Sequence, residues 1–316
     1  KGGTVDLSVL PDAFANAWIG FMIAGGVGTK GVYALAGGQL ISCATRPALL
    51  AGNYAESVFN QSGGTSTLYN LNLTRAWPMT GGSGTLNLSD GTLRLSGTVV
   101  KGYSTGSVNF SGGRVESVST GAVFEADVPV SLATGESGDV VFAQAQSSYT
   151  NTLTGTLSGS GGLVQDGPGT LALSGVNAFS GPATVKGGTL LVNSALQNTR
   201  EIFADGGHLE LLAAIPSLTN LSVRVAGTTV AITGSATPFP DGLTLSLAQG
   251  IVTELDFDGV VEVDRLVLGG QAKTPGLYGG TESAAPHKPS SAFFTGTGTL
   301  RVLNGPSPQG TVLGIR

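Results

Sequence analysis

A short phrase recurs along this chain, and its clearest copy is Ala183-Thr184-Val185-Lys186-Gly187-Gly188-Thr189-Leu190. Alternating apolar residues lead to a glycine pair, and a second alternating run follows it. Related phrases, centred on Gly-Gly or Asp-Gly, occupy residues 32–40, 58–65, 86–93, 108–115 and 202–209. Self-similarity of this kind is typical of stacked repeat units rather than of one globular core. The phrase therefore predicts a solenoid.

The second glycine of each copy marks an expected corner of this solenoid. Glycine suits a tight corner because it adopts positive φ angles without a steric cost. Neighbouring glycines are 26, 27, 22 and 19 residues apart, and one interval of 75 residues would cover about three units. The uneven spacing predicts coils of unequal length whose corners accept insertions. The predicted corner residues are Gly38, Gly64, Gly91, Gly113, Gly188 and Gly207.

Composition and periodicity favour an all-β chain. Glycine accounts for 51 of the 316 residues, and charged residues for 11%, against about 25% in ordinary soluble domains. Period-2 alternation recurs, for example in residues 85–88, 170–173 and 243–247, whereas no long window shows the 3.6-residue period of a helix. We predict a single-chain parallel β-helix with Val, Leu, Ile and Phe inward and Thr, Ser and Asn outward. At about 23 residues per coil, it would have roughly 13 to 14 coils.

Three zones differ in how sharply the repeat is marked. Residues 1–130 carry loose Gly-Gly coils, and residues 131–216 carry the sharpest repeats. In residues 217–316 the glycine corners thin out and the strands lengthen, so we interpret this zone as a cap or assembly segment. Residues 304–310 are rich in Gly, Pro and Ser and are typical of a linker, which favours a chain that continues, or once continued, beyond Arg316.

Charge and hydropathy exclude several classes of partner. The net charge of −5, without any cluster of Lys and Arg, argues against nucleic acid. No uninterrupted apolar run reaches the ~18 residues of a spanning helix, and the apolar stretch 13–24 is interrupted by Asn16 and Gly20. We expect no membrane span. Cys43 is the sole cysteine, which excludes a disulfide within the chain.

Acidic residues gather in two short segments and are the candidate chemistry of the chain. Alternation places Asp256 and Asp258 on the same side of a strand, and the spacing makes this pair the candidate calcium ligands of the chain. The alternative is a solvated strand edge whose charges discourage aggregation, and we favour it. The other acidic residues of the two segments are Glu262 and Asp264, and Glu201, Asp205 and Glu210. His208 and His287 have no partners at zinc-binding spacing, and no nucleophile elbow or phosphate loop occurs. We expect no catalytic residues, no cofactor and no enzyme.

One segment carries a specific resemblance. Gly159–Gly175 reads GSGGLVQDGPGTLALSG, and Asn177–Val192 reads NAFSGPATVKGGTLLV. Over about 34 residues this segment resembles the autotransporter-associated β-strand repeat, with tolerable departures at Asp166, Phe179 and Pro182. The resemblance implies a passenger-like parallel β-helix, extracellular or on a bacterial cell surface. It implies no catalytic residue.

The ends of a solenoid expose unpaired backbone groups, and stacking of subunits end to end would cover them. Trp18 and Phe21 near one end, and Leu300 and Val302 near the other, are therefore candidate assembly residues. The leading hypothesis is an extracellular structural subunit that self-assembles into a fibre, sheath or layer as a homo-oligomer. The alternative is a cell-surface adhesin or glycan-binding passenger, whose partners would be surface glycans. A polysaccharide lyase or hydrolase is the third and weakest hypothesis.

Overall fold

The computed structural model describes residues 3–6, 21–24, 26–42, 44, 47–52, 54–74, 81–136, 138–233, 239–288 and 293–306. These residues form β-strands joined by turns, and none of them is helical, so no described helix is long and apolar enough to cross a bilayer. The strands are β1 (Thr4–Asp6), β2 (Phe21–Ala24), β3 (Lys30–Leu35), β4 (Gln39–Ile41), β5 (Ala48–Ala51), β6 (Glu56–Thr74), β7 (Ser83–Val100), β8 (Thr105–Phe110), β9 (Arg114–Phe124), β10 (Val130–Leu132), β11 (Val140–Gln144), β12 (Thr150–Leu153), β13 (Leu157–Gly159), β14 (Leu163–Leu173), β15 (Ala183–Val192), β16 (Glu201–Ala204), β17 (His208–Leu211), β18 (Asn220–Val223), β19 (Thr229–Thr233), β20 (Thr244–Leu247), β21 (Val252–Asp256), β22 (Val260–Val263), β23 (Arg265–Leu268), β24 (Gln271–Ala272), β25 (Gly276–Gly279), β26 (Phe294–Thr295) and β27 (Thr299–Val302).

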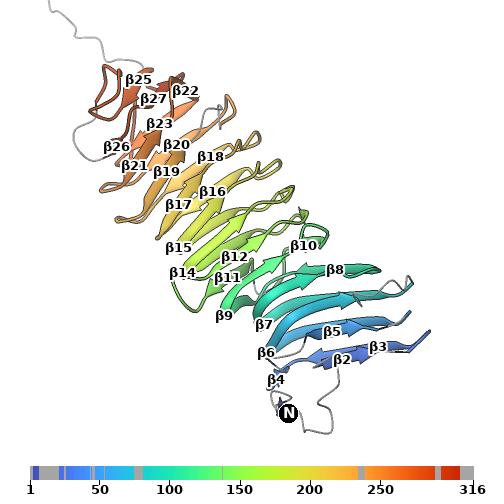
Figure 1. The fold of residues 1–316 in the computed structure, drawn as a ribbon. Helices are drawn as coiled ribbons and strands as arrows, with labels where there is room; N and C mark the ends of the chain where they lie inside the picture. The colour runs from blue at the N-terminus through green and yellow to red at the C-terminus, as the bar shows by residue number, and fades with distance from the viewer. Residues whose placement is uncertain are drawn as a thin grey trace, which may run out of the picture.

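The strands stack in three parallel columns around one interior, and the stack is elongated from β2 and β3 at one end to β25 and β27 at the other (Figure 1). Face 1 contains β3, the first parts of β6 and β7, and then β8, β10 and β13. Face 2 runs from β1 and β4 through β11 to the first parts of β14 and β15, and on through β16, β18, β20 and β23. Face 3 runs from β2 and β5 through β12 to the last parts of β14 and β15, and on through β17, β19, β21 and β26. The predicted parallel β-solenoid is confirmed.

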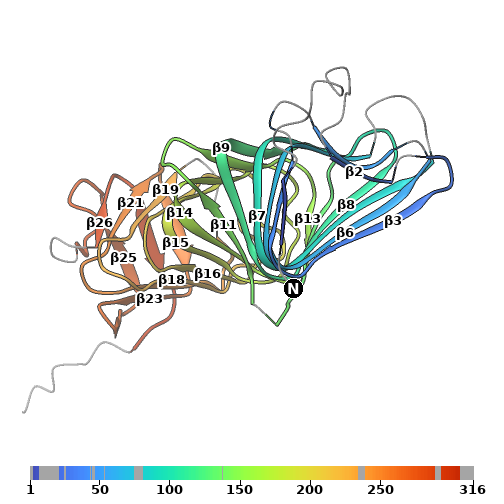
Figure 2. The same cartoon turned by 90° about the horizontal axis from the view of Figure 1, so that it is seen from below.

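The solenoid has about 10 turns, and the prediction of 13 to 14 coils was too high. Hydrogen-bonded side chains on adjacent coils give the coil lengths: Asn60 and Asn87 are 27 residues apart, whereas Asp205 and Arg224 are 19 apart. Near the C-terminus Glu262 meets Arg301, 39 residues later, because β23, β24 and β25 lie between them. The estimate failed because it gave every residue to a coil of average length. Figure 2 shows the broad coils of β3, β6, β7 and β8 beside the narrower later ones.

Strand pairing continues across both positions at which the sequence separates its zones. Near residue 130, β8 pairs with β10 and β9 with β11. Near residue 216, β16 pairs with β18 and β17 with β19. The described zones therefore belong to one continuous stack.

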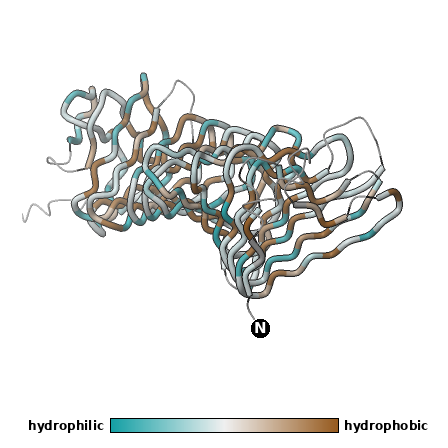
Figure 3. Tube along the Cα trace, turned by 60° about the horizontal axis from the view of Figure 1, so that its bottom comes forward, coloured by the Kyte–Doolittle hydropathy of each residue, from teal (hydrophilic) through white to brown (hydrophobic). Residues whose placement is uncertain are grey.

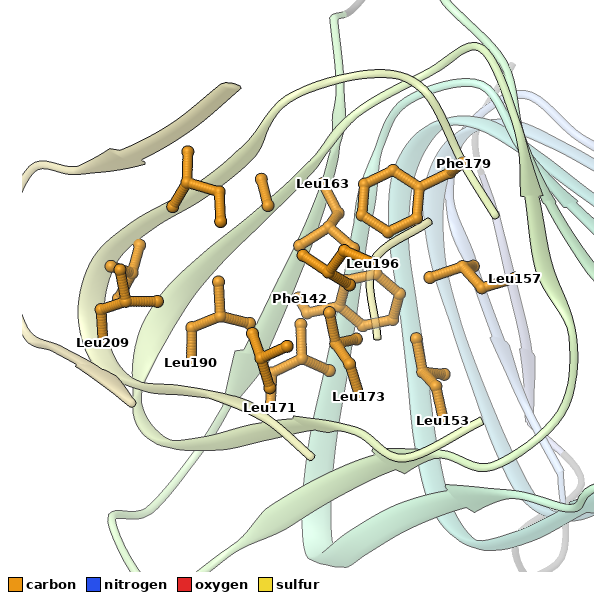
Figure 4. Packing of buried hydrophobic residues seen from close by; sticks show 14 of the residues in the cluster. Phe142, Leu153, Leu157, Leu163, Leu171, Leu173, Phe179, Leu190, Leu196 and Leu209 are labelled. Carbon is orange, nitrogen blue, oxygen red and sulfur yellow. The ribbon is translucent and has the colours of Figure 1, made fainter. Parts of the chain in front are cut away.

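The core consists of apolar ladders that run along the axis, because parallel pairing places equivalent residues of each coil above one another. The tube in Figure 3 alternates between apolar and polar residues along the strands. Figure 4 shows one portion of the interior, into which Leu171, Leu190 and Leu209 point from successive coils. Each is fully buried, and burying a Leu side chain contributes about 1.5–3 kcal/mol. Two kinds of contact therefore hold each coil to the next: backbone hydrogen bonds between paired strands and apolar contacts between stacked side chains.

All six predicted corner glycines have positive φ, between 59° and 84°. They form two corner lines rather than one. The first line turns the chain from face 1 to face 2 and comprises Gly38, Gly64, Gly91 and Gly113. The second turns it from face 2 to face 3 and includes Gly188 and Gly207. The interval of 75 residues spans the coils of β10–β12 and β13–β14 before it reaches β15, as the prediction of about three units requires, and it also changes from the first corner line to the second.

Close backbone approach gives glycine a second reason to occupy these corners. A Cβ on Gly64 would lie 2.6 Å from the carbonyl oxygen of Gly38, and one on Gly207 would lie 2.4 Å from that of Gly188. Real Cβ atoms do not approach oxygen so closely, so a side chain at these positions would separate the coils.

Buried amides brace the corners from inside. Gln165 donates from Nε2 to Oε1 of Gln144 at 2.7 Å, and Gln144 donates in return to Gln165 at 3.1 Å. Gln165 also donates to the carbonyl oxygens of Gly167 and Gly169. Both glutamines are almost fully buried, so these bonds satisfy groups that would otherwise destabilise the core.

Two adjacent glycines provide a matched test of the corner geometry. Gly188→Ala places a Cβ 2.1 Å from the carbonyl oxygens of Gly167 and Gly169, at a φ of 59°. We expect it to destabilise the protein by more than the ~1–2 kcal/mol that a left-handed conformation alone costs. Gly187→Ala meets its nearest atom at 3.6 Å and should change stability by less than about 1 kcal/mol. Denaturant unfolding followed by circular dichroism compares them, and equal stabilities would contradict the proposed corner packing.

Candidate functional site

Three strands near the C-terminal end form a sheet of their own, in the order β22, β27 and β25. Leu300 and Val302 are buried in β27, which pairs in parallel with β22 and antiparallel with β25. A strand hydrogen-bonded along both edges has no free edge for strand addition. Strand addition to β27 itself is therefore opposed, because β25 already occupies one of its edges. An assembly contact that involves Leu300 and Val302 in another way stays a prediction.

The candidate assembly residues near the N-terminal end are Trp18 and Phe21. Trp18 lies outside the described residues. Phe21 begins β2, whose backbone pairs with Ala48 of β5. Within the described part of the chain, β1, β2 and β3 each pair with a single neighbouring strand. An assembly contact at this end stays a prediction.

The acidic segments form pairs between and within coils. Glu262 accepts a hydrogen bond from Arg301 at 3.1 Å, Asp264 accepts one from Asn304, and Asp205 accepts two from Arg224. The hydrogen bond from Arg224 to Asp205 raises the pKa of Arg224. The Arg224 and Arg301 side chains are about half exposed, so solvent screens their ion pairs and each pair contributes at most about 1 kcal/mol.

Asp256 and Asp258, the calcium candidates, are both exposed at the end of β21 and in the turn after it. The described residues contain no group of three or more His, Cys, Asp or Glu close enough to hold a metal ion. The described part of the chain thus adds no third acidic ligand to this pair.

An asparagine ladder occupies the outer side of face 1. Asn87 donates to Asn60 at 2.7 Å, and Asn109 donates to Asn87 at 2.8 Å. The three side chains are half-buried by one another's stacking. Part of their hydrogen-bonding capacity is therefore used between coils, so the main role of this ladder is to hold adjacent coils together.

A different surface combines exposed aromatic rings with carboxylates, at the corner where face 3 leads into face 1. Tyr103 follows β7 at this corner and is 58% exposed. It borders a shallow hollow of about 490 Å³, whose other walls include Val100, Glu125 and Asp127. Tyr54, which is 43% exposed, follows β5 at the same corner two coils earlier. We call Tyr54, Tyr103, Glu125 and Asp127 the tyrosine corner.

Hydrogen bonds from the neighbouring coil hold the Tyr103 turn. Thr74 is buried and donates from Oγ1 to the carbonyl oxygen of Lys101 at 2.6 Å, while the Ser104 N–H donates to the same Oγ1 at 3.2 Å. Lys101 in turn lies 3.3 Å from the Asp127 carboxylate. The backbone on each side of Tyr103 is therefore fixed, and its ring projects from a supported turn.

The other tyrosine has an unusual backbone. Tyr54 has a φ of 51°, in the left-handed region that bulky residues avoid. A Cβ on Gly81 of the next coil would lie 2.8 Å from the Tyr54 ring, so the ring lies directly over that glycine. Strained residues often occur at functional sites, where the surrounding structure holds them.

The tyrosines differ in their surroundings. Tyr33 stacks on Phe59 with ring centroids 5.4 Å apart, whereas Tyr54 and Tyr103 share one corner. Each stands three residues after the last residue of a face-3 strand, β5 or β7. That shared offset was the available signal, and it required the strand ends to be known.

Comparison with known proteins identifies one segment. Residues 163–192 match the model of a family described as the passenger-associated-transport-repeat. They span β14 and β15 together with the corner between them, at the centre of the continuous stack. The resemblance of this segment to an autotransporter repeat is thus confirmed, and the segment belongs to a continuous β-solenoid.

One curated protein is similar to part of this chain. The adhesin BmaC autotransporter of Brucella suis biovar 1 (strain 1330) is 39% identical over 88 residues. Those residues are 28% of this chain and only 2% of that protein, so the match spans a very small part of the relative's length. No solved structure matches this chain.

The backbone strain at Tyr54 is testable by two substitutions that remove the same ring. Tyr54→Gly should be more stable than Tyr54→Ala by about 1–2 kcal/mol, because only alanine retains a Cβ in the left-handed region. The same pair at Tyr103, which has no positive φ, serves as the control and should show alanine at least as stable as glycine. Thermal unfolding measures all four variants. An identical order at both positions would contradict the strain at Tyr54.

Proposed function

We propose that this chain is part of an exported passenger and acts outside the cell as an adhesive stalk without enzymatic activity. The observation that carries the proposal is the transport-repeat match at residues 163–192, which lies inside one uninterrupted solenoid. The similarity to a protein named as an adhesin also supports an adhesive function. Adhesion therefore replaces self-assembly as the leading function.

The architecture suits an adhesive stalk for physical reasons. Each coil pairs with the coils before and after it, so lengthening the stack extends the molecule without a larger core. The lateral faces repeat the same backbone geometry, and corner side chains project at regular intervals. With one cysteine in the chain, no internal disulfide can contribute to holding the stack together.

The side chains of the acidic segments support the non-enzymatic part of the proposal. Glycosidases require two carboxylic groups placed across a substrate bond. Glu262, Asp264 and Asp205 instead form pairs with basic or amide partners on adjacent coils. We propose that these carboxylates help to hold adjacent coils together.

Self-assembly remains a prediction without a supporting contact at the C-terminal end. Pairing of β27 with both β22 and β25 opposes strand addition there. Any end-to-end contact would have to use the N-terminal strands or another surface.

The adhesive function is tested with beads coated with the purified chain. We expect such beads to attach to epithelial cells in a saturable way, and soluble chain to compete for attachment. Beads coated with heat-unfolded chain provide the control, because they carry the same composition without the solenoid surface. Equal attachment of folded and unfolded coatings would overturn the proposal. Electron microscopy of the same preparation at rising concentration tests the alternative function, self-assembly. If self-assembly is the function, we expect ordered fibres and no attachment to cells.

A further inference from the structure

The hollow at the tyrosine corner has the chemistry of a recognition site. One wall is the Tyr103 ring, which is 58% exposed and makes no hydrogen bond or ring contact with the described residues. Another wall carries Glu125 and Asp127. The Glu125 side chain has no ion-pair or hydrogen-bond partner among the described residues, whereas Asp127 is paired with Lys101 at 3.3 Å. The hollow thus offers a ligand an exposed aromatic ring on a supported turn, beside a carboxylate that has no partner among the described residues.

These groups are complementary to a sugar ring. A pyranose presents a face of C–H groups, which packs on an aromatic ring. Around its edge are hydroxyl groups, which donate hydrogen bonds to carboxylates. A hollow of about 490 Å³ falls within the size range of small-molecule sites. The shallow shape lets a chain of sugars enter and leave at either side, as a glycan on a surface requires.

Resting on the proposed adhesive function, we infer that the tyrosine corner binds neutral or amino sugar units of a surface glycan. Tyr103 stacks on the sugar ring, and Glu125 and Asp127 accept hydrogen bonds from its hydroxyl groups.

The local charge selects among saccharides. Two carboxylates face the hollow, and among the described residues the ammonium group beside them is that of Lys101, which is already paired with Asp127. Uronic and sialic acid units would bring a further negative charge next to Glu125. The site therefore favours neutral sugars, and amino sugars gain a favourable charge interaction.

Tyr54 extends the site along the solenoid axis. Adjacent coils are separated by about 4.8 Å, so two coils place Tyr54 and Tyr103 about 10 Å apart along one corner. Each ring can contact a sugar unit of a linear glycan aligned with the axis, and the corner of the coil between them, residues 75–80, lies outside the described residues. The asparagine ladder on face 1 is a weaker candidate because its amides already bond one another.

The experiment measures binding of cellotetraose, chitotetraose and tetragalacturonate to the whole chain by saturation-transfer NMR and calorimetry. We expect the two uncharged oligosaccharides to bind and tetragalacturonate to bind at least tenfold more weakly. Tyr103→Ala should weaken binding about tenfold, consistent with the worth of an aromatic contact. Glu125→Gln should reduce the discrimination against tetragalacturonate. Leu212→Ala and Glu201→Gln, which alter exposed residues elsewhere on the solenoid, are the matched controls.

The outcomes separate the two proposals. Circular dichroism first establishes that each variant retains the wild-type fold. Binding that survives Tyr103→Ala, or that falls equally in the controls, overturns the assignment of the site. Cell attachment without binding to any of the three oligosaccharides overturns the saccharide inference and leaves the adhesive function standing. If folded beads attach to cells no better than unfolded ones, the adhesive function itself fails.

Discussion

Register between coils is the constraint on which the rest of this structure depends. Parallel pairing places each residue over its equivalent in the next coil, as Leu171, Leu190 and Leu209 show. An inward position must then be apolar or satisfied by its neighbours in coil after coil, as Gln144 and Gln165 are. At the corners the same stacking brings backbone atoms so close that Gly64 and Gly207 have no room for a Cβ. Core, corners and outer ladders are therefore consequences of one alignment.

Alternation and glycine content were sufficient to predict the class of fold, because both follow directly from that alignment. The number of coils was not predictable from them. Gly113 and Gly188 belong to different corner lines, and their spacing along the chain does not reveal it. The closing strand β25 was also missed, although the Gly269-Gly270 pair between β23 and β24 was a hairpin signal near it. Leu300 and Val302 looked like a terminal strand because the sequence does not show which earlier segment folds back over them.

The candidate site shows the same limit. Acidic residues are conspicuous in a chain with few charges, so they attracted a chemical interpretation, yet Asp205 and Glu262 form pairs between coils. The tyrosine corner depends on how far Tyr54 and Tyr103 stand from their strand ends, a quantity that only the stacked structure supplies. A solenoid brings distant residues into one row, so its recognition surfaces follow from register and not from local motifs. The adhesive function proposed for this chain depends on that property, because it requires a long lateral surface to meet a partner.

The most direct test of the register is a disulfide between adjacent coils, in a Cys43→Ser background. Asn60→Cys with Asn87→Cys joins neighbouring strands, whose separation of about 4.8 Å falls within the Cα range of disulfides. The same Asn60→Cys with Asn109→Cys spans two coils, about 10 Å, and is too far apart. The structure predicts rapid and complete intramolecular oxidation of the first pair and none of the second, measured by thiol titration and peptide mass spectrometry. Failure of the first pair to close, or equal closure of both, would contradict the stacking described.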